Sequence, residues 1–478
     1  MPSERHTLSL SRAVYDNAPV WFQTWMVSAQ GFLYTHRRWD IKLGAAFLDR
    51  LRVSQWWSSD QFLDYQVQYL RKHLEYAQEN IPYYAQLFRT SGLDVKRLSC
   101  VDDLCRIPLL EKRTVVENPH AFLQNGKPQR SWNRLFTSGT TGSPMKLYSS
   151  RESFTRTWSF VFRLREWAGV DDPILPRRVQ FTGRDIVPQN EISGKGPYWR
   201  LNRPGKALLM STTHISEQSV PAYVKAINDF EPILVDGYPS AIALVSRIAK
   251  GLKLTLHRPA AVITSAETLI PEDRAEIESA FGCPVFDQYA SSDTGAFICD
   301  CEHGSLHTNP EFGICEVLKE DGTPAQPGEH GEIVATSFCN SEQVFIRYRI
   351  GDIAVVGSPE PCACGRAMPR IAAVIGRTDD ILYIPGRGYV GRLDPVFKGL
   401  GHLYEAQIVH ETLDRLRVDV VPGPGYDSAV REMLISNLRK KVGDRISIHV
   451  RRVEAIPRGP RGKFRSVVSL CRDKYPRI

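Results

Sequence analysis

TSGTTGSP, at residues 137–144, is the stretch of this chain with the sharpest structural signal. Its serines, threonines and glycines predict a loop whose backbone N–H groups converge on an anion, with hydroxyl groups as extra donors and no bulky side chain to block close approach. The pattern GxxxxGK[ST] of nucleoside triphosphatases is absent here. A flexible surface turn is the other interpretation of the stretch, so the choice depends on the rest of the chain.

Short β-type runs and helical patterns alternate downstream of this stretch. ILV at 233–235 and AAVIT at 260–264 have the composition of strands, and PEDRAEIESAF at 271–281 has the pattern of a helix. This alternation predicts βα units and a mostly parallel sheet. Upstream, residues 58–88 carry apolar residues three and four positions apart, which predicts an amphipathic helix that Pro82 closes in a turn.

The character of the sequence changes near residue 380. GRTDDILYIPGRGYVG, residues 376–391, is rich in glycine, and a compact basic segment follows it. We place a domain boundary there and expect two domains, 1–378 and 379–478. Residues 457–465, PRGPRGKFR, are expected to be irregular. The remaining pattern predicts a small α+β domain, with strands at 406–410, 416–421 and 446–453 and a helix at 428–443.

Length, composition and charge narrow the class of protein. A chain of 478 residues is too long for a lone binding module, and 42% hydrophobic with 24% charged residues excludes a disordered or fibrous protein. The net charge of +8 (61 basic minus 53 acidic residues) is concentrated in residues 451–478, which hold nine Lys or Arg and two acids. This basic end is either a nucleic-acid patch or one wall of a site for a phosphate-bearing substrate, and its sparse aromatic residues disfavour the first.

The cysteines and the apolar segments indicate a reducing compartment. No signal peptide is recognisable, and the most apolar early segment, residues 20–34, is too short and too polar to span a bilayer. We therefore expect a cytoplasmic protein whose ten cysteines are reduced thiols or metal ligands.

Three cysteines and one histidine form a candidate metal site. Cys301 precedes His307 by six residues, and Cys362 and Cys364 flank one alanine. Three thiolates and an imidazole are a closed tetrahedral ligand set of the kind that structural zinc prefers, provided that the intervening chain folds back on itself. Buried free thiols remain the other interpretation of the cysteines. The competing ligands are Cys299 and His303.

Seven motifs follow one another along the chain. They are TSGTTGSP (137–144), GYPS (237–240), SAE (265–267), YASSD (289–293), RYRIGD (347–352), GRTDD (376–380) and GK (462–463). In this order and at these separations they resemble the adenylate-forming ligases, most closely the branch of phenylacetate–CoA ligase and the related capsule-biosynthesis (CapK-like) proteins. The resemblance implies an α/β fold with a large N-terminal adenylate-forming domain of mixed, mostly parallel sheets flanked by helices. It also implies a small α+β C-terminal domain on a hinge.

The resemblance further implies a nucleotide site. Its 137–142 loop would hold the β- and γ-phosphates of ATP. Tyr289 would stack on adenine, with Ala266 and Glu267 lining the purine side. Asp352 would accept hydrogen bonds from both ribose hydroxyls, an arrangement that a carboxylate provides well. The complete implied set of ATP-binding residues is Ser138, Gly139, Thr140, Thr141, Gly142, Ala266, Glu267, Tyr289, Ser292, Asp352, Arg377 and Lys463.

Catalytic roles fall on three residues by the same resemblance. Lys463 would reach the α-phosphate during adenylation, and Arg377 would contact ribose or phosphate. Asp293 would bind Mg²⁺, for which a carboxylate is a suitable ligand. Asp379 matches the hinge residue about which the small domain rotates between two half-reactions. The implied acyl pocket includes Phe181, Asp185 and Tyr238.

The chain departs from the family pattern at three motif positions. Ala290 stands where Gly is common, Asp293 replaces Glu, and Ile350 replaces Thr. Because aspartate is one methylene shorter than glutamate, Mg²⁺ is expected to bind through a water or to shift. Some members of the branch have Cys/His and CxC elements that bind zinc, and this supports a zinc site here.

The expected activity is that of an ATP- and Mg²⁺-dependent acid ligase, which forms an acyl-AMP with release of pyrophosphate and transfers the acyl group to CoA. The alternative acceptor is an amine or a hydroxyl group, in the biosynthesis of a surface polysaccharide or a secondary metabolite. A zinc-stabilised nucleic-acid-binding protein is a third interpretation, outside the ligases, but it does not explain Asp352 and Lys463. We expect a small-molecule acid, ATP and the acceptor as partners, with no nucleic acid and no transmembrane segment, and we allow for a homodimer.

Overall fold

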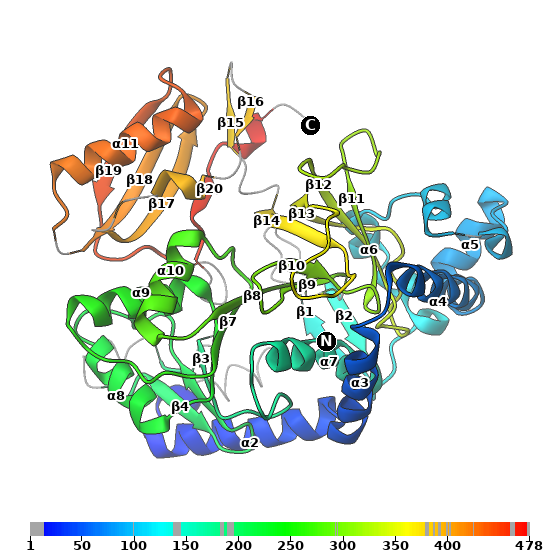
Figure 1. Cartoon of the computed structure of the whole chain (residues 1–478), viewed down its shortest axis with the longest axis horizontal. Coiled ribbons are helices and arrows are strands. Elements are labelled where there is room, and N and C mark those ends of the chain that lie inside the picture. The colour runs from blue at the N-terminus through cyan, green and yellow to red at the C-terminus, as the bar shows by residue number, and fades with distance from the viewer. Residues whose placement is uncertain are drawn as a thin grey trace. The chain divides into compact units, whose positions relative to one another are not determined.

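The structure is a computed structural model of the chain (Figure 1). The chain forms two compact units: unit 1 comprises residues 1–28, 177–285 and 375–478, and unit 2 comprises residues 29–176 and 286–374. The structure describes residues 14–98, 100–136, 145–181, 186–188, 196–291, 293, 295–377, 382–385, 388–390, 393–397, 400, 403–423, 425–458 and 464–475.

Unit 1 contains parallel strands connected through helices. The strand order is β7-β6-β3-β5-β4, in which β3 runs parallel to both β5 and β6, β6 runs parallel to β7, and only the edge strand β4 is antiparallel. The predicted alternation of strand and helix is thus confirmed here. The strands are β3 (Arg178–Phe181), β4 (Trp199–Asn202), β5 (Ala207–Met210), β6 (Leu234–Gly237) and β7 (Ala261–Ser265). The helices, which Figure 1 shows beside them, are α8 (Val220–Phe230), α9 (Pro239–Gly251) and α10 (Pro271–Phe281).

The C-terminal part of unit 1 is a small α+β layer with its own core. Its sheet has the order β19-β18-β17-β20, and helix α11 lies beside it (Figure 1). Leu434 and Leu438 of α11 are fully buried, together with Val418 of the sheet. The elements are β17 (Leu403–Thr412), β18 (Arg415–Pro422), α11 (Ser428–Val442), β19 (Ser447–Arg452) and β20 (Val467–Ser469), with β15 (Leu382–Ile384), β16 (Gly388–Val390) and the 3-10 helices η7 (Asp394–Phe397) and η9 (Arg472–Lys474).

Unit 2 is built around an antiparallel sheet. Its strand order is β11-β12-β13-β14-β10-β9-β8, and every pair whose register is described runs antiparallel. A separate pair, β1 with β2, flanks residues 137–144, which lie outside the described residues. The strands are β1 (Asn133–Phe136), β2 (Lys146–Ser149), β8 (Val285–Ala290), β9 (Phe297–Asp300), β10 (Leu306–Thr308), β11 (Gly313–Leu318), β12 (His330–Ser337), β13 (Tyr348–Val356) and β14 (Arg370–Arg377).

The helical segment expected at 58–88 consists of two helices. Ser58 and Gln61 form a reciprocal capping box that begins α4, and the helix ends before Ile81, whose backbone is extended. Pro82 then occupies the first turn of a second helix, a position where its missing N–H group costs nothing. The expected turn at Pro82 is therefore wrong: the helix does end, but another begins. The helices of this part of the chain are α2 (Val20–Arg38), α3 (Ile41–Ser54), α4 (Ser59–Asn80), α5 (Pro82–Ser91), α6 (Lys112–Glu117) and α7 (Arg151–Trp167), with the 3-10 helices η1 (Val95–Arg97), η2 (Val101–Arg106), η3 (Pro119–Phe122) and η4 (Gln124–Gly126).

Among the described residues, no helix combines the length and the apolar character that crossing a bilayer requires.

Gly237 closes β6 at a point where the backbone admits no side chain. Its φ is +145°, and a Cβ atom built there would lie 2.0 Å from the carbonyl oxygen of Phe181 on β3. The next residue, Tyr238, donates its backbone N–H to that same oxygen at 3.0 Å. Close approach of the two strands therefore requires glycine at the start of the GYPS motif.

The variant Gly237→Ala is expected to lose at least about 4 kcal/mol of unfolding free energy, because the clash is with backbone and can be relieved only by separating β3 from β6. Urea denaturation measures this loss. Gly169→Ala is the matched control, since Gly169 also has a positive φ (+75°) but no atom lies within 4 Å of the added Cβ. The control is expected to lose about 1 kcal/mol. Equal losses in the two variants would contradict the explanation.

Candidate active site and metal site

In unit 2, Tyr289 and Asp352 form one hydrogen-bonded pair. Tyr289 lies near the end of β8 and Asp352 in β13, 63 residues later, and the phenol hydroxyl donates to Oδ2 of Asp352 at 2.6 Å. Burial raises the pKa of Tyr289 well above its ordinary value, and the charge of Asp352 raises it further. The phenol therefore stays protonated and keeps donating to the carboxylate. Two residues assigned to one nucleotide by their motifs are thus in direct contact.

Asp293 adds a second carboxylate beside this pair. Asp293 follows Tyr289 by four residues, and its charge, after burial and the charge and hydrogen bond of Asp352, also raises the pKa of that phenol. Two acidic groups around one neutral phenol make this end of β8 electronegative. Such a place favours a cation, and carboxylate oxygens are the ligand type that Mg²⁺ takes.

In unit 1, Glu267 holds together two segments of the chain. It follows β7 directly after Ala266, whose φ of +69° is left-handed. Oε2 of Glu267 accepts from the hydroxyl of Ser240 at 2.6 Å, and Oε1 accepts from the backbone N–H of Phe464 at 2.5 Å. Burial raises the pKa of Glu267, and these hydrogen bonds oppose the rise. The carboxyl group consequently links the first turn of α9 to the C-terminal part of unit 1.

The contact at Phe464 concerns the segment expected to carry the catalytic lysine. Phe464 directly follows Lys463, which lies outside the described residues. The guanidinium of Arg458 lies 4.9 Å from the Phe464 ring and forms an ion pair with Glu405. Sequence reasoning placed Glu267 on the purine side of the nucleotide and did not predict this contact. Ser240 belongs to the GYPS motif, but the motif alone does not indicate its partner.

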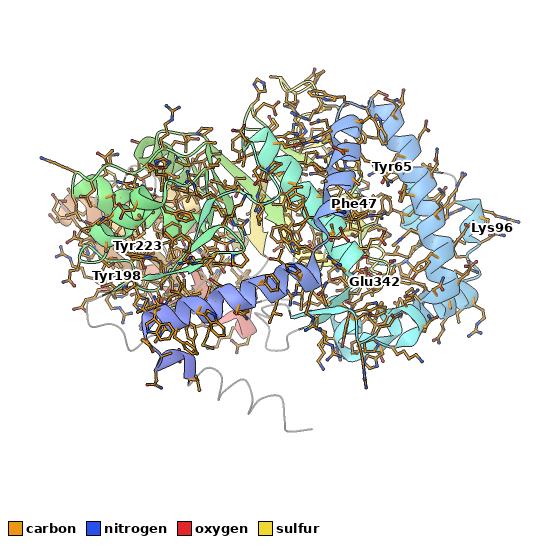
Figure 2. The ribbon with its side chains drawn as sticks, turned by 90° about the horizontal axis from the view of Figure 1, so that it is seen from below. Phe47, Tyr65, Lys96, Tyr198, Tyr223 and Glu342 are labelled. Carbon is orange, nitrogen blue, oxygen red and sulfur yellow. The ribbon has the colours of Figure 1, made fainter. Side chains whose placement is uncertain are left out.

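Phe181 and Tyr238, assigned to the acyl pocket, are both buried in unit 1. The Phe181 ring stacks on Tyr223 at 6.4 Å between centroids, and Tyr223 stacks on Tyr198 at 5.6 Å (Figure 2 labels both tyrosines). The Tyr223 hydroxyl donates to the carbonyl oxygen of Ser211 at 2.9 Å. Phe181 is therefore part of a packed aromatic stack, and its role in binding an acid stays a prediction.

Several other expected site residues cannot be placed. The side chain of Arg377, the last residue of β14, is not among those described. The following lie outside the described residues: Ser138, Gly139, Thr140, Thr141, Gly142, Asp185, Ser292, Asp379 and Lys463.

The four predicted metal ligands come together in unit 2. Their donor atoms all lie within 4.8 Å of one another, and all four residues are buried. The sulfur atoms of Cys301 and Cys362 are 3.8 Å apart, and the sulfur of Cys364 lies 3.6 Å from Nε2 of His307. A tetrahedron with zinc–sulfur bonds of about 2.3 Å and a zinc–nitrogen bond of about 2.0 Å has S···S edges of about 3.8 Å and S···N edges of about 3.5 Å. The separations thus fit zinc, and the S···S separation is far beyond a disulfide bond.

The surroundings of the four ligands also suit a metal ion. Nδ1 of His307 lies 2.9 Å from the carbonyl oxygen of Met368, which orients Nε2 toward the sulfurs. Burial opposes ionisation of Cys362, but hydrogen bonds from the Cys364 backbone and from nearby side chains outweigh it and lower the pKa of that thiol to about 6. The competing ligand Cys299 is engaged with the side chain of Asn309 instead, and neither it nor His303 is part of the cluster.

Arg366, which sequence reasoning missed, attaches this cluster to the helices of unit 2. Its guanidinium lies 4.2 Å from the Trp167 ring and 4.9 Å from the Trp56 ring. Its side chain donates to Gln55 at 3.2 Å and to Glu302 at 2.6 Å. Its backbone N–H donates to the sulfur of Cys364 at 3.5 Å. The only sequence signal was an arginine two residues after the CxC pair.

Comparison with known proteins confirms the resemblance to the adenylate-forming ligases. Residues 382–470 match the family model of the CapK C-terminal domain. Protein CapK of Staphylococcus aureus is 27% identical over 461 residues, covering 95% of this chain and 98% of the relative. The phenylacetate-coenzyme A ligase of Thermus thermophilus is 25% identical over 437 residues, which cover 84% of this chain and 95% of the relative. A crystal structure of 2-hydroxyisobutyryl-CoA ligase in the postadenylation state covers 88% of this chain and 92% of its own, with a TM-score of 0.68 at 18% identity, which confirms the α/β fold.

The raised pKa of Glu267 predicts how stability changes with pH. Because folding raises this pKa, the folded state binds the proton more tightly than the unfolded state does. The contribution of Glu267 is therefore most favourable below the ordinary glutamate value of about 4.5 and is lost as pH rises through the folded pKa. In urea denaturation between pH 4.5 and 8, Glu267→Gln should gain stability relative to wild type as pH rises.

Glu320→Gln, which removes an exposed carboxyl group from unit 2, is the control for the loss of one charge. Parallel pH curves for wild type and Glu267→Gln would show that the half-buried carboxyl group is ionised without cost in the folded protein, and would contradict the prediction.

Proposed function

We propose that this protein is an ATP-dependent acid ligase that forms an acyl-AMP, releases pyrophosphate and transfers the acyl group to CoA. The observation that carries the proposal is the hydrogen bond between Tyr289 and Asp352, because it joins the adenine-stacking and ribose-binding residues of the expected site. Likeness to phenylacetate-coenzyme A ligases over most of the chain supports the same activity.

In the first half-reaction a carboxylate oxygen attacks the α-phosphorus of ATP. A new P–O bond forms, the bond to the β-phosphate breaks, and pyrophosphate leaves with its electrons. Two anions must approach each other, so the residues around them have to offset the repulsion. Lys463 is the cation assigned to the α-phosphate. At 4 Å and an effective dielectric constant of about 20 one such charge contributes about 4 kcal/mol, or about three orders of magnitude in rate.

The chain's own residues hold the nucleotide in this scheme. Asp352 takes both ribose hydroxyls while the Tyr289 phenol keeps the carboxylate in place, and the Tyr289 ring faces adenine. Asp293 fits as a ligand of Mg²⁺, because it offers a carboxylate beside an already electronegative pair. When bound, Mg²⁺ screens the charge of the phosphates. The 137–142 loop donates N–H and hydroxyl groups to the same phosphates.

In the second half-reaction the CoA thiolate attacks the acyl carbon and AMP leaves. We assign the division between the two domains to 1–378 and 379–478, with Asp379 as the hinge. The family match at 382–470 and the hydrophobic core formed within 382–467 support a C-terminal part that can move as a body. Such a movement would take Lys463 away from the α-phosphate and bring other groups of the C-terminal part to the CoA thiol.

A second acceptor is favoured by one observation. Among the relatives compared, Protein CapK matches at higher identity and over more of the chain than the phenylacetate-coenzyme A ligases do. The same first half-reaction followed by transfer to an amine or hydroxyl group, as in the biosynthesis of a surface polysaccharide, is therefore the competing proposal. Consumption of CoA separates the two.

Zinc is the metal that we assign to Cys301, His307, Cys362 and Cys364. Three sulfurs and one imidazole leave no open position for a substrate, so the ion would be structural. None of the ten cysteines, all of which are described, forms a disulfide, and we propose a reducing compartment such as the cytoplasm.

The decisive test of the activity is exchange of labelled pyrophosphate into ATP that depends on an added carboxylic acid. Screening aryl, fatty, amino and hydroxy acids should reveal at least one that supports exchange in wild type. Lys463→Ala should reduce the rate about a thousandfold, and Asp352→Asn should weaken ATP binding, because an amide offers the ribose hydroxyls one neutral acceptor oxygen in place of two charged ones.

Lys474→Ala, near the C-terminus, is the control and should retain exchange. Near-normal exchange by Lys463→Ala would defeat the assignment of that lysine. Absence of AMP formation by wild type across the whole screen would defeat the ligase proposal.

Metal analysis of protein purified without chelator tests the zinc assignment. Wild type should hold about one equivalent, and Cys364→Ser should hold less than half and unfold at lower temperature, since metal binding adds to folding free energy. Cys299→Ser is the matched control: it changes a buried cysteine close in sequence to Cys301 and should retain the metal. Less than about half an equivalent in wild type, or equal loss in both variants, would overturn the assignment.

A further inference from the structure

Helix α2 exposes a row of large apolar side chains. The exposed fractions are 72% for Trp21, 61% for Trp25, 49% for Phe32 and 60% for Leu33. Trp21, Trp25 and Phe32 are spaced by four and seven residues, which places them on one face of an α-helix, and Leu33 widens that face. Figure 2 views α2 from below with its side chains drawn. We call these four residues the aromatic face.

The opposite face of α2 fixes which way the aromatic face points. Gln23 is fully buried, and its Oε1 accepts from Nε of Arg200 at 2.8 Å. Its Nε2 donates to the carbonyl oxygens of Tyr15 and Ala18 at 3.0 and 2.8 Å. Val27, one turn along, is buried in the same part of unit 1. Rotating the helix to hide the aromatic face would break these hydrogen bonds of the buried Gln23 amide, so the packing of α2 on unit 1 keeps the aromatic face exposed.

Helix α2 carries basic charge alone, and the acid that follows it, Asp40, caps α3 by accepting from the N–H of Leu43. α2 contains no aspartate or glutamate, and its last turn holds His36, Arg37 and Arg38. Lys42 follows in the first turn of α3, and Ile41 beside it is 50% exposed. A helix with an aromatic face and basic residues at its end is complementary to an interface that is apolar within and anionic at its surface.

We propose that α2 is a docking surface for an anionic phospholipid membrane. The aromatic face enters the boundary between headgroups and acyl chains, where tryptophan is favoured because its ring is apolar and its N–H group can stay hydrated. Arg37 and Lys42 contact the phosphates. Binding is shallow and reversible, since one face of one helix enters the interface.

A second copy of the chain fits this surface less well. In a symmetric dimer through α2 the basic last turn of each copy needs acidic groups opposite it, and the helix provides none. The basic last turn, with no acid on the helix to face it, therefore favours an anionic lipid surface as the occupant.

Co-sedimentation of the full chain with vesicles tests the proposal. Wild type should bind vesicles of phosphatidylglycerol mixed with phosphatidylcholine more strongly than vesicles of phosphatidylcholine alone, and added salt should weaken the binding. Trp21→Ser, Trp25→Ser and Phe32→Ser combined should lower the partition coefficient by about tenfold or more. Because these side chains are exposed, the midpoint of thermal unfolding should not fall.

A matched triple variant controls for the loss of exposed apolar groups elsewhere: Leu63→Ser, Met433→Ser and Leu470→Ser, at positions that are 51%, 47% and 63% exposed. It should bind vesicles as wild type does. The proposal is overturned if wild type binds neither vesicle, if both triple variants lose binding equally, or if light scattering shows a dimer that only the α2 variant dissociates.

Discussion

A carboxylate removed from water needs hydrogen-bond donors or cations around it, and this constraint applies to one acid in each unit. In unit 2 a neutral phenol donates to Asp352, and in unit 1 a hydroxyl and a backbone N–H donate to Glu267. Each acid is thus fixed in position before any ligand binds. A carboxylate that is already oriented loses little conformational freedom when it binds a ligand, which is how such a site gains affinity without additional contacts.

The order of the strands explains why residues far apart in sequence meet at Glu267. Strands β6 and β7 run parallel as neighbours, so the motifs that follow them, GYPS and SAE, emerge at the same edge of the sheet. Ser240 and Glu267 are 27 residues apart and meet for this reason. Gly237 contributes by letting β6 approach β3 closely enough to keep this edge in register. Ligands of α/β proteins bind at such carboxyl ends of parallel strands, so the fold itself directs these motifs toward one place.

The correct predictions from the sequence came from local residue patterns and from the order of the motifs. The helix at 271–281 has the predicted limits, because its pattern and its flanking Pro and Gly are local signals. The second helix after Pro82 was missed, because a proline that ends one helix is equally suited to begin another. The motifs suggested that Tyr289 and Asp352 serve one ligand. They did not reveal the contact between Glu267 and Phe464, since a backbone N–H carries no side-chain signature.

The pairing of the strands explains why the metal ligands predicted from their spacing meet in the structure. Strand pairing sets His307 opposite Arg370 on β14, and Cys301 follows β9, the other neighbour of β10, so the sheet itself draws the two ligand pairs together. A zinc ion would then close a loop whose ends are already neighbours, at small entropic cost. The same loop extends to Arg366, whose guanidinium lies near Trp56 and Trp167 and whose N–H reaches Cys364. Loss of the metal would free this arginine as well, so the ion would stabilise the packing of the loop on α7 in addition to the loop itself.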